Sequence, residues 1–384
     1  MKRILTVMMA VAGVVISADA ATITGVTAKQ RYPWNGKVDI TYTVTGDLEA
    51  GLSPDKMTGV LLLSVTNRVT GTNYVAYTRC VSGDTGTVEG VHHVVWDLNA
   101  QGLEFKSTDV VFTVAYTDKP KPYCVIDLSG GANASSYPVS YLTDIPSGGW
   151  TDEYKTTKLV LRRIEPGTFM MGDSYQVTLT KPFYCGVFEV TQKQYELVTG
   201  SKPSYFSYDN TLPVEWVSWN TIRGDSTTYN WPSSTTVDSS SFVGRLQART
   251  GLHLDLPTEA QWEYACRAGT KKTYYWWDSM HDNYCWYIDN SSSTKPVGRK
   301  KPNAWGLYDM SGNVKEFCLD WNGDLSNGVT DPKGPSSGSR RVTRGGSWCD
   351  DVDYCASSYR GGGILPSSSY RYIGFRLVRT LSNK

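Results

Sequence analysis

The sequence predicts an α+β protein of two domains in which short strands and turns outnumber helices. Between residues 21 and 116, apolar side chains alternate with polar ones in short runs separated by Gly, Asp, Asn and Ser, which is typical of strands and turns. Helix start signals are found in the second half of the chain. The Pro- and Lys-rich segment 117–122 separates the two patterns, and 384 residues suffice for two or three domains.

Residues 1–20 have the pattern of a secretory signal peptide. Lys2 and Arg3 precede an apolar segment at 4–16, and an Ala-Asp-Ala cleavage motif follows at 18–20. The apolar segment is too short to span a bilayer, and no Cys lies near the cleavage site to accept a lipid. We therefore expect an exported protein, secreted, periplasmic or on the cell surface, without a membrane span.

Residues 21–118 are predicted to form an immunoglobulin-like β-sandwich. One strand is indicated by alternation over 38–44, and others by the runs 60–65, 91–96 and 110–116. His92 and His93 lie in one run, one on each face, and are interpreted as ordinary strand residues. Residues 119–155 have no clear period and are predicted to be a linker and connecting segment that lies on the second domain.

Residues 156–384 are predicted to form the second domain, with little regular secondary structure. Strands are expected near Leu159–Ile164 and at Tyr184–Val190. Helices are expected at Gln192–Val198, at Ser240–Arg249, and after a capping box formed by Thr258 and Gln261. Beyond Gly269 the pattern indicates mostly turns and short strands.

Composition excludes some partners and favours others. Lys and Arg total 38 against 37 Asp and Glu, so nothing in the charge favours nucleic acid or an anionic membrane surface. The 13 Trp and 25 Tyr suit a domain of irregular loops held by large side chains, and they also suit a binding surface.

Eight cysteines in an exported protein predict structural disulfides. No pair has the CxxC spacing, and the four His show no spacing to a Cys that indicates a zinc site. The sequence leaves 105 possible pairings open. The cysteines are Cys80, Cys124, Cys185, Cys266, Cys285, Cys318, Cys349 and Cys355.

The stretch 349–372 is predicted to be a recognition loop. Fifteen of its 24 residues are Tyr, Ser, Gly or Asp, a composition in which stiff Tyr supplies contact area and the small polar residues supply adaptable contacts. It lies between Arg344–Trp348 and Ile373–Val378, and the second of these reads as a buried strand. The alternative is a solvated Ser- and Gly-rich loop without a ligand.

Several stretches of the second domain, taken together, resemble the formylglycine-generating enzyme family, also called the sulfatase-modifying factor family. They occur in the family's order and cover roughly residues 158–380. The resemblance implies an elaborated variant of the C-type lectin fold. The stretches are GTFMMG at 167–172, FEVT at 188–191, PVEWVSW at 213–219, LPTEAQWEY at 256–264, NAWGLYDMSGNV at 303–314, RGGSW at 344–348 and IGFR at 373–376.

The resemblance carries a catalytic alternative. In catalytic members two Cys, five apart after the GGS turn, bind Cu(I), and oxygen then converts a substrate Cys to formylglycine. Here Cys355 matches the second Cys, but Cys349 lies one residue too early and Asp350 stands at the thiolate position. Lys315 stands where catalytic members have Trp. The candidate catalytic residues of such a copper-dependent oxidase, acting on a Cys of a sulfatase or other protein, are Cys355, Cys349, Ser347 and Tyr354.

The resemblance also implies a calcium site. Two carboxylates seven residues apart, bracketing a Gly-containing turn, are suitable oxygen ligands for Ca²⁺. The alternative is a surface turn with unpaired acids. The implied ligands are the side chains of Asp309 and Glu316 and the carbonyls of Gly312 and Val314.

The frame of the C-terminal loop is similar to the variable region of ligand-binding proteins diversified by retroelements, in which Asn codons are rewritten at surface positions. We therefore predict a non-catalytic recognition protein that binds a protein or glycan ligand. The alternatives are the oxidase and a cell-surface or matrix scaffold, and the sequence leaves the ligand and the oligomeric state open. The predicted ligand-binding residues are Asp350, Asp351, Asp353, Tyr354, Tyr359, Tyr370 and Tyr372.

Overall fold

Two units make up the chain in this computed structural model, Met1–Lys121 and Pro122–Lys384. The predicted signal peptide, residues 1–20, lies outside the described residues. Within the described part of the chain, no helix has the length and apolar character needed to cross a membrane. The structure describes residues 21–31, 35–46, 53–85, 89–103, 110–276 and 280–381.

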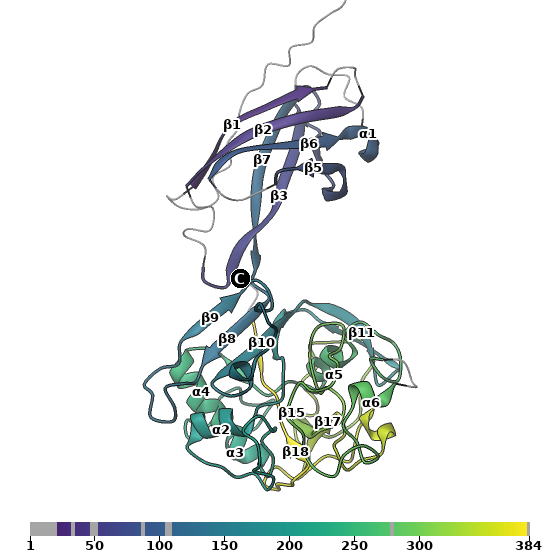
Figure 1. Cartoon of the computed structure of the whole chain (residues 1–384). Helices are drawn as coiled ribbons and strands as arrows, with labels where there is room; N and C mark the ends of the chain where they lie inside the picture. Colours follow the sequence, from purple (N-terminus) through teal and green to yellow (C-terminus); the bar gives the residue numbers. More distant parts are fainter. Residues whose placement is uncertain are drawn as a thin grey trace, which may run out of the picture. The chain divides into compact units, whose positions relative to one another are not determined.

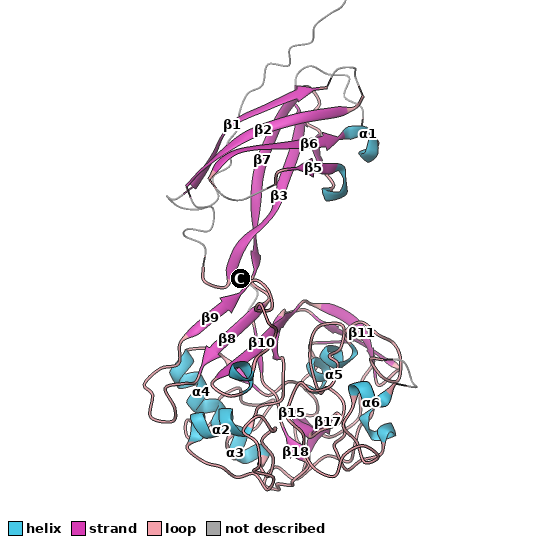
Figure 2. Ribbon diagram, viewed as in Figure 1, coloured by secondary structure: helices cyan, strands magenta, loops and turns pink. Residues whose placement is uncertain are grey.

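The N-terminal unit consists of two antiparallel sheets with one shared core (Figures 1 and 2). Residues 38, 40, 42 and 44 of β2 are buried, as the alternation predicted, because every second side chain of a strand points to the same face. The Tyr42 and Tyr116 hydroxyls, one from each sheet, lie 2.9 Å apart. The immunoglobulin-like assignment stays a prediction. One sheet has the order β1 (Ala21–Gln30), β2 (Lys37–Gly46), β6 (Gly90–Asp97), β5 (Val81–Gly83), and the other β4 (Asn73–Val75), β3 (Lys56–Asn67), β7 (Val110–Pro120); the helical turns η1 (Thr78–Cys80) and α1 (Leu98–Gln101) connect them.

The C-terminal unit is built on a six-stranded antiparallel sheet and two three-stranded sheets. The six-stranded sheet has the order β14 (Leu254–Asp255), β19 (Val378–Thr380), β13 (Phe183–Gly186), β10 (Lys158–Ile164), β8 (Tyr123–Asp127), β9 (Val139–Leu142). A second sheet consists of β17 (Arg341–Arg344), β15 (Lys315–Trp321) and β18 (Ile373–Gly374), and a third of β11 (Gly167–Met171), β12 (Tyr175–Leu179) and β16 (Val329–Thr330).

The helices of this unit are short, and their start signals are local. Capping boxes begin α2 at Thr191, α3 at Ser218 and α5 at Thr258, because each cap hydroxyl accepts a backbone N–H that lacks a helical partner. The helices are α2 (Gln192–Thr199), α3 (Trp219–Arg223), α4 (Phe242–Thr250), α5 (Glu259–Arg267) and α6 (His281–Tyr284), with 3₁₀ turns η2 (Asp152–Lys155) and η3 (Val352–Cys355).

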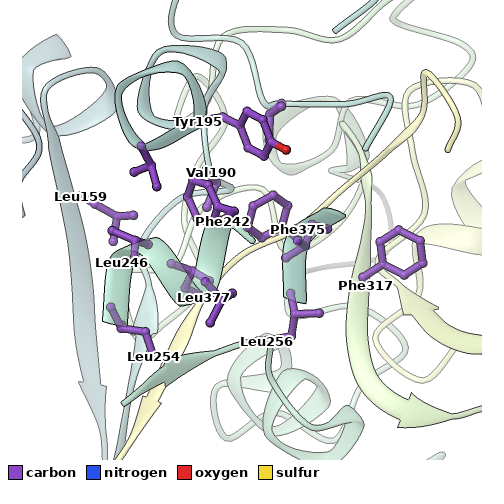
Figure 3. Close-up of a cluster of buried hydrophobic side chains, with 14 of the residues drawn as sticks. Leu159, Val190, Tyr195, Phe242, Leu246, Leu254, Leu256, Phe317, Phe375 and Leu377 are labelled. Carbon is purple, nitrogen blue, oxygen red and sulfur yellow. The ribbon is translucent and has the colours of Figure 1, made fainter. Parts of the chain in front are cut away.

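Two buried clusters form most of the core of the C-terminal unit. Figure 3 shows the first, in which the rings of Tyr195, Phe242 and Phe375 come together beside Leu246 and Leu377. The Tyr195 and Phe242 rings are stacked with centroids 5.2 Å apart. Phe375 and Leu377 directly follow the C-terminal loop, so this cluster anchors one end of the loop.

The segment 119–155, predicted as a linker and connecting segment that lies on the second domain, contains regular strands. Most of it belongs to the C-terminal unit, where β8 and β9 form one side of the six-stranded sheet. Residues 123–126 of β8 are all buried, because this strand lies between β10 and β9 and is covered on both faces. A strand covered on both faces has no polar alternation to detect.

The predicted disulfides are not formed in this structure. All eight cysteines lie among the described residues and all are free thiols. Seven are buried and Cys349 is partly exposed. The buried ones act as small apolar side chains within the cores, Cys80 in the N-terminal unit and the other six in the C-terminal unit.

Candidate functional site

The C-terminal loop starts from a tight turn after β17. Gly345 and Gly346 have φ of +96° and +69°, a region that glycine adopts without strain. A Cβ on Gly346 would lie 2.5 Å from the Cys355 Sγ, so the turn needs glycine for space as well. Trp348 then donates its backbone N–H to the Asn313 carbonyl at 2.9 Å, which ties the start of the loop to the SGNV turn.

Buried ion pairs hold both ends of the loop. At the start, the guanidinium of Arg344 pairs with Glu263 of α5 and donates to the carbonyl of Ser357. At the end, Arg376 donates to both oxygens of Glu316, at 2.7 and 2.6 Å. Pairing of this kind is what makes fully buried charges tolerable. The loop therefore departs from a rigid frame and returns to it.

The predicted ligand-binding residues are at the surface or close to it. Asp351 and Asp353 are exposed, and Tyr354 and Tyr370 each keep 40% of their surface accessible. The other three, Asp350, Tyr359 and Tyr372, are half-buried.

The four tyrosines form two pairs. The Tyr354 and Tyr359 rings meet edge to face with centroids 4.8 Å apart, while Tyr370 and Tyr372 are stacked at 5.2 Å. Aromatic pairs at these separations attract one another beyond the area they bury. The loop thus presents its tyrosines as two ordered patches.

Two further aromatic residues, Tyr205 and Trp216, adjoin this surface. Trp216 is 46% exposed, and its backbone N–H donates to the Tyr370 carbonyl at 3.1 Å. Its ring stacks on Tyr205 at 5.9 Å, and the Arg371 guanidinium lies over both Tyr205 and Trp348. The sequence analysis used Trp216 only as part of the PVEWVSW stretch. No sequence signal marks Trp216 for this surface, because its backbone has a φ of +62°, which is uncommon in a non-glycine residue and cannot be read from sequence.

A small cleft lies between the loop and the frame. Its volume is about 170 Å³, and Tyr359, Tyr372 and Lys315 contribute side chains to its lining. Residues 361–363, all glycine, line another part. The absence of side chains at these three positions brings the backbone itself to the cleft wall.

Asp350, which the family resemblance places at the position of the first thiol, lies in an ion pair with Lys315. The Asp350 carboxylate accepts hydrogen bonds from the Lys315 ammonium, at 2.8 Å, and from the Ser347 hydroxyl. The same ammonium lies 5.3 Å from the centre of the Tyr372 ring. Two of the departures from the catalytic pattern, Asp350 and Lys315, are therefore each other's partners.

The two candidate thiols lie in different surroundings. Cys349 is partly exposed, with its Sγ 3.5 Å from the Ser347 Oγ. Cys355 is fully buried, and its neighbour there is the thiol of Cys285, which the sequence analysis did not single out. Tyr354, the remaining candidate, is exposed next to Cys355 on η3.

The residues implied for calcium are all buried, and they fit a cation unevenly. Asp309 is buried, with Oδ2 accepting from the Gly298 N–H at 2.6 Å and Oδ1 without a partner. Burial raises the pKa of Asp309 to about 6. An unpaired buried carboxylate oxygen suits a hard cation. Both oxygens of Glu316, in contrast, already accept from Arg376, and one also accepts from Trp262.

The two implied carbonyl ligands lie in a turn that Glu189 fixes. Glu189 accepts hydrogen bonds from the Asn313 side chain at 2.7 Å and from the Val314 N–H at 3.1 Å. These two bonds fix the turn from Gly312 to Val314. Burial, reinforced by the charge of Asp309, raises the pKa of Glu189 well above its usual range. Among the described residues, no cluster of three or more His, Cys, Asp or Glu side chains is arranged to hold a metal ion.

Known proteins similar in sequence to this chain include a chaperone and a formylglycine-generating enzyme. Chaperone protein LppX of Paenibacillus barcinonensis is 30% identical over 261 residues, which is 56% of this chain and 88% of that protein. The formylglycine-generating enzyme of Streptomyces coelicolor is 37% identical over 142 residues, 32% of this chain and 45% of the enzyme. The chain thus spans about half the length of such an enzyme.

Among solved structures, Treponema denticola variable protein 1 matches with 29% identity and a TM-score of 0.48, over 58% of this chain and 96% of that one. The family model described as the sulfatase-modifying factor enzyme 1-like domain matches residues 151–381, which contain the whole loop and its frame. This chain therefore belongs to the sulfatase-modifying factor enzyme 1-like family.

Proposed function

We propose that this chain is an exported, non-catalytic member of its family that binds a protein or glycan ligand through the 349–372 loop. One observation carries the proposal: exposed aromatic side chains gather on a loop whose two ends are fixed by buried ion pairs. Rigid aromatic contact surfaces bind at low cost in conformational entropy. Tyr205 and Trp216 enlarge this surface beyond the loop, since Trp216 hydrogen-bonds to Tyr370 and Arg371 lies over Tyr205.

The Lys315–Asp350 ion pair supports the non-catalytic assignment. A Cu(I) site needs two soft thiolate ligands directed at one point. Here a hard carboxylate takes one ligand position and already has a cationic partner. The residue at the other ligand position, Cys355, is enclosed among buried apolar side chains. Lys315 and Ser347 thus both hydrogen-bond to Asp350 at the position where a copper ligand would be needed.

The test is ligand capture by variants of the loop tyrosines. The labelled mature chain is applied to glycan and peptide arrays, and positive spots are titrated. Tyr354→Ala combined with Tyr370→Ala should weaken binding at least about tenfold, because central aromatic contacts contribute about 2 kcal/mol or more. The melting temperature should change by only a few degrees, since both rings are partly exposed.

The matched control is Tyr175→Ala, a similarly exposed tyrosine on β12. It should leave capture unchanged. Loss of fold in the double variant would mean that the loop tyrosines belong to the core, and the proposal would fail. A chain that captures nothing on either array would instead support the scaffold alternative.

The oxidase alternative has its own readout. It requires tight Cu(I) binding that Cys355→Ser abolishes, together with oxygen uptake in the presence of a Cys-containing peptide. We expect neither. Export is tested separately by the N-terminus of the mature protein, which should be Ala21.

A further inference from the structure

Cys285 and Cys355 meet in the interior of the C-terminal unit. Cys285 directly follows α6, with its N–H bonded to the His281 carbonyl at 2.8 Å, and Cys355 is the last residue of η3. Both side chains have no exposed surface. They pack in one cluster with the aromatic residues at 274–276.

Two neighbouring glycine turns make room for the two sulfurs. Gly312 donates its N–H to the Gly345 carbonyl at 2.8 Å, so the two turns touch. A Cβ on Gly312 would lie 2.7 Å from the Cys285 Sγ, and a Cβ on Gly346 would lie 2.5 Å from the Cys355 Sγ. Each thiol therefore lies against one of two touching turns, and the two thiols interact directly with each other.

The surroundings of the two thiols favour an uncharged form of the sulfurs over thiolates. Both sulfurs lie in an interior lined by aromatic and aliphatic side chains. A soft metal ion needs thiolates, which this environment penalises. A disulfide is uncharged and apolar, and it suits an enclosed cluster of aromatic and aliphatic side chains.

We propose that Cys285 and Cys355 form a disulfide when the protein matures in an oxidising compartment. The oxidant is a small-molecule disulfide such as oxidised glutathione. During folding, before the interior closes, one cysteine attacks it as the thiolate, which forms a mixed disulfide and releases one glutathione. The second cysteine then attacks the protein sulfur and releases the other. Two protein thiols are oxidised, one glutathione disulfide is reduced to two thiols, and the two protons end on glutathione.

The bond would join the end of α6 to the root of the recognition loop. It would also assign Cys355, the match to the second catalytic thiol, to a structural role with a partner other than Cys349. This inference stands apart from the ligand-binding proposal, because it concerns the interior and requires no ligand.

The test is disulfide mapping of the full mature chain. The chain is folded with reduced and oxidised glutathione, its free thiols are alkylated, and the tryptic peptides are analysed by mass spectrometry. Cys349 and Cys355 lie on one tryptic peptide, 345–360, so fragmentation of the cross-linked pair is used to assign the bond. We expect Cys285 joined to Cys355, with Cys349 and the other cysteines alkylated. A Cys349–Cys355 cross-link, or full alkylation of both Cys285 and Cys355, would overturn the proposal.

Variants give a second readout. Cys349→Ser should leave the cross-link intact, whereas Cys285→Ser should abolish it and leave Cys355 alkylated. If Cys285→Ser fails to fold, the wild-type map alone still decides the question. A cross-link that forms only after the chain is denatured also overturns the proposal.

Discussion

The buried pair of Arg376 and Glu316 offers the sharpest test of how the loop is held. The two side chains are 0% and 1% exposed, and two hydrogen bonds of 2.6 and 2.7 Å join them. Arg376 also donates to the carbonyls of Gly186 and Tyr308, each at 2.9 Å. Glu316→Gln keeps the volume and removes the negative charge, which leaves the guanidinium buried without its counter-charge.

The expected loss is about 3–5 kcal/mol, the usual cost of breaking a buried pair from one side. For a unit of this size each kcal/mol lowers the melting temperature by about 2–4 °C, so the shift should be about 6–20 °C. Tryptophan fluorescence is a suitable probe, because 11 of the 13 Trp lie at or after Trp150. Melting is measured with a chelator and again with excess Ca²⁺, since the family resemblance implies Glu316 as a calcium ligand.

The control is Glu165→Gln. Glu165 pairs with Arg163 at 2.7 Å but is 68% exposed, and a surface pair contributes only about 0–1 kcal/mol. The double variant Glu316→Leu with Arg376→Met should lose less than the sum of the single losses, because no lone charge remains. If Glu316→Gln melts within the range of the Glu165 control, the pair does not hold the loop as argued.

Three further outcomes follow from single residues. Burial, reinforced by the charge of Glu259, raises the pKa of Asp320 to about 8 from an ordinary value near 3.8. The folded state therefore holds a proton that the unfolded state has released, and stability should fall as pH rises between these values. Asp320→Asn should reduce that fall in the free energy of unfolding by an amount on the order of 1 kcal/mol per pH unit. Both proteins are unfolded with urea at pH 5 and at pH 8, and an equal fall between these pH values in the wild type and the variant would contradict the prediction. If Asp309 Oδ1 is a calcium ligand, Ca²⁺ should raise the melting temperature of the wild type but not of Asp309→Asn, and an equal rise in both would remove Asp309 from the site. In Gly244→Ala, the new Cβ would lie 1.9 Å from the Asp238 carbonyl oxygen, so overpacking of about 1–3 kcal/mol opposes a helix-propensity gain of about 1 kcal/mol. A net loss of stability is expected, and a net gain would show that the contact relaxes freely.

Local signals in the sequence predicted local structure well. The capping box of Thr258 and Gln261 and the alternation over 38–44 are complete within a few residues, and both are found in the structure. Strand β8 was not predicted, because a strand covered on both faces lacks alternation. The exposure of Asp351, Asp353, Tyr354 and Tyr370 was expected from the composition of the loop, whereas residues 355–357 of the same loop are buried.

Pairings between residues far apart in the chain could not be predicted from the sequence. The Lys315–Asp350 pair joins residues 35 apart, and nothing in either neighbourhood marks the other as its partner. The contact of Cys285 with Cys355 spans 70 residues and depends on the space left by Gly312 and Gly346. Both depend on how separate turns come together, and that is set by the whole fold.

The buried ion pairs at the two ends of the loop have a consequence for how the molecule can change. Arg344 and Arg376 hold the chain on either side of the 349–372 stretch, so most substitutions within the stretch leave those anchors intact. Side chains at the exposed positions of the stretch can then change with little effect on folding, whereas Arg360 pairs with the buried Glu259 and Ser357 is itself buried. Under the proposed function, selection for a new target would act on those exposed positions while the scaffold stays constant, provided that Gly346 and Cys355 are kept.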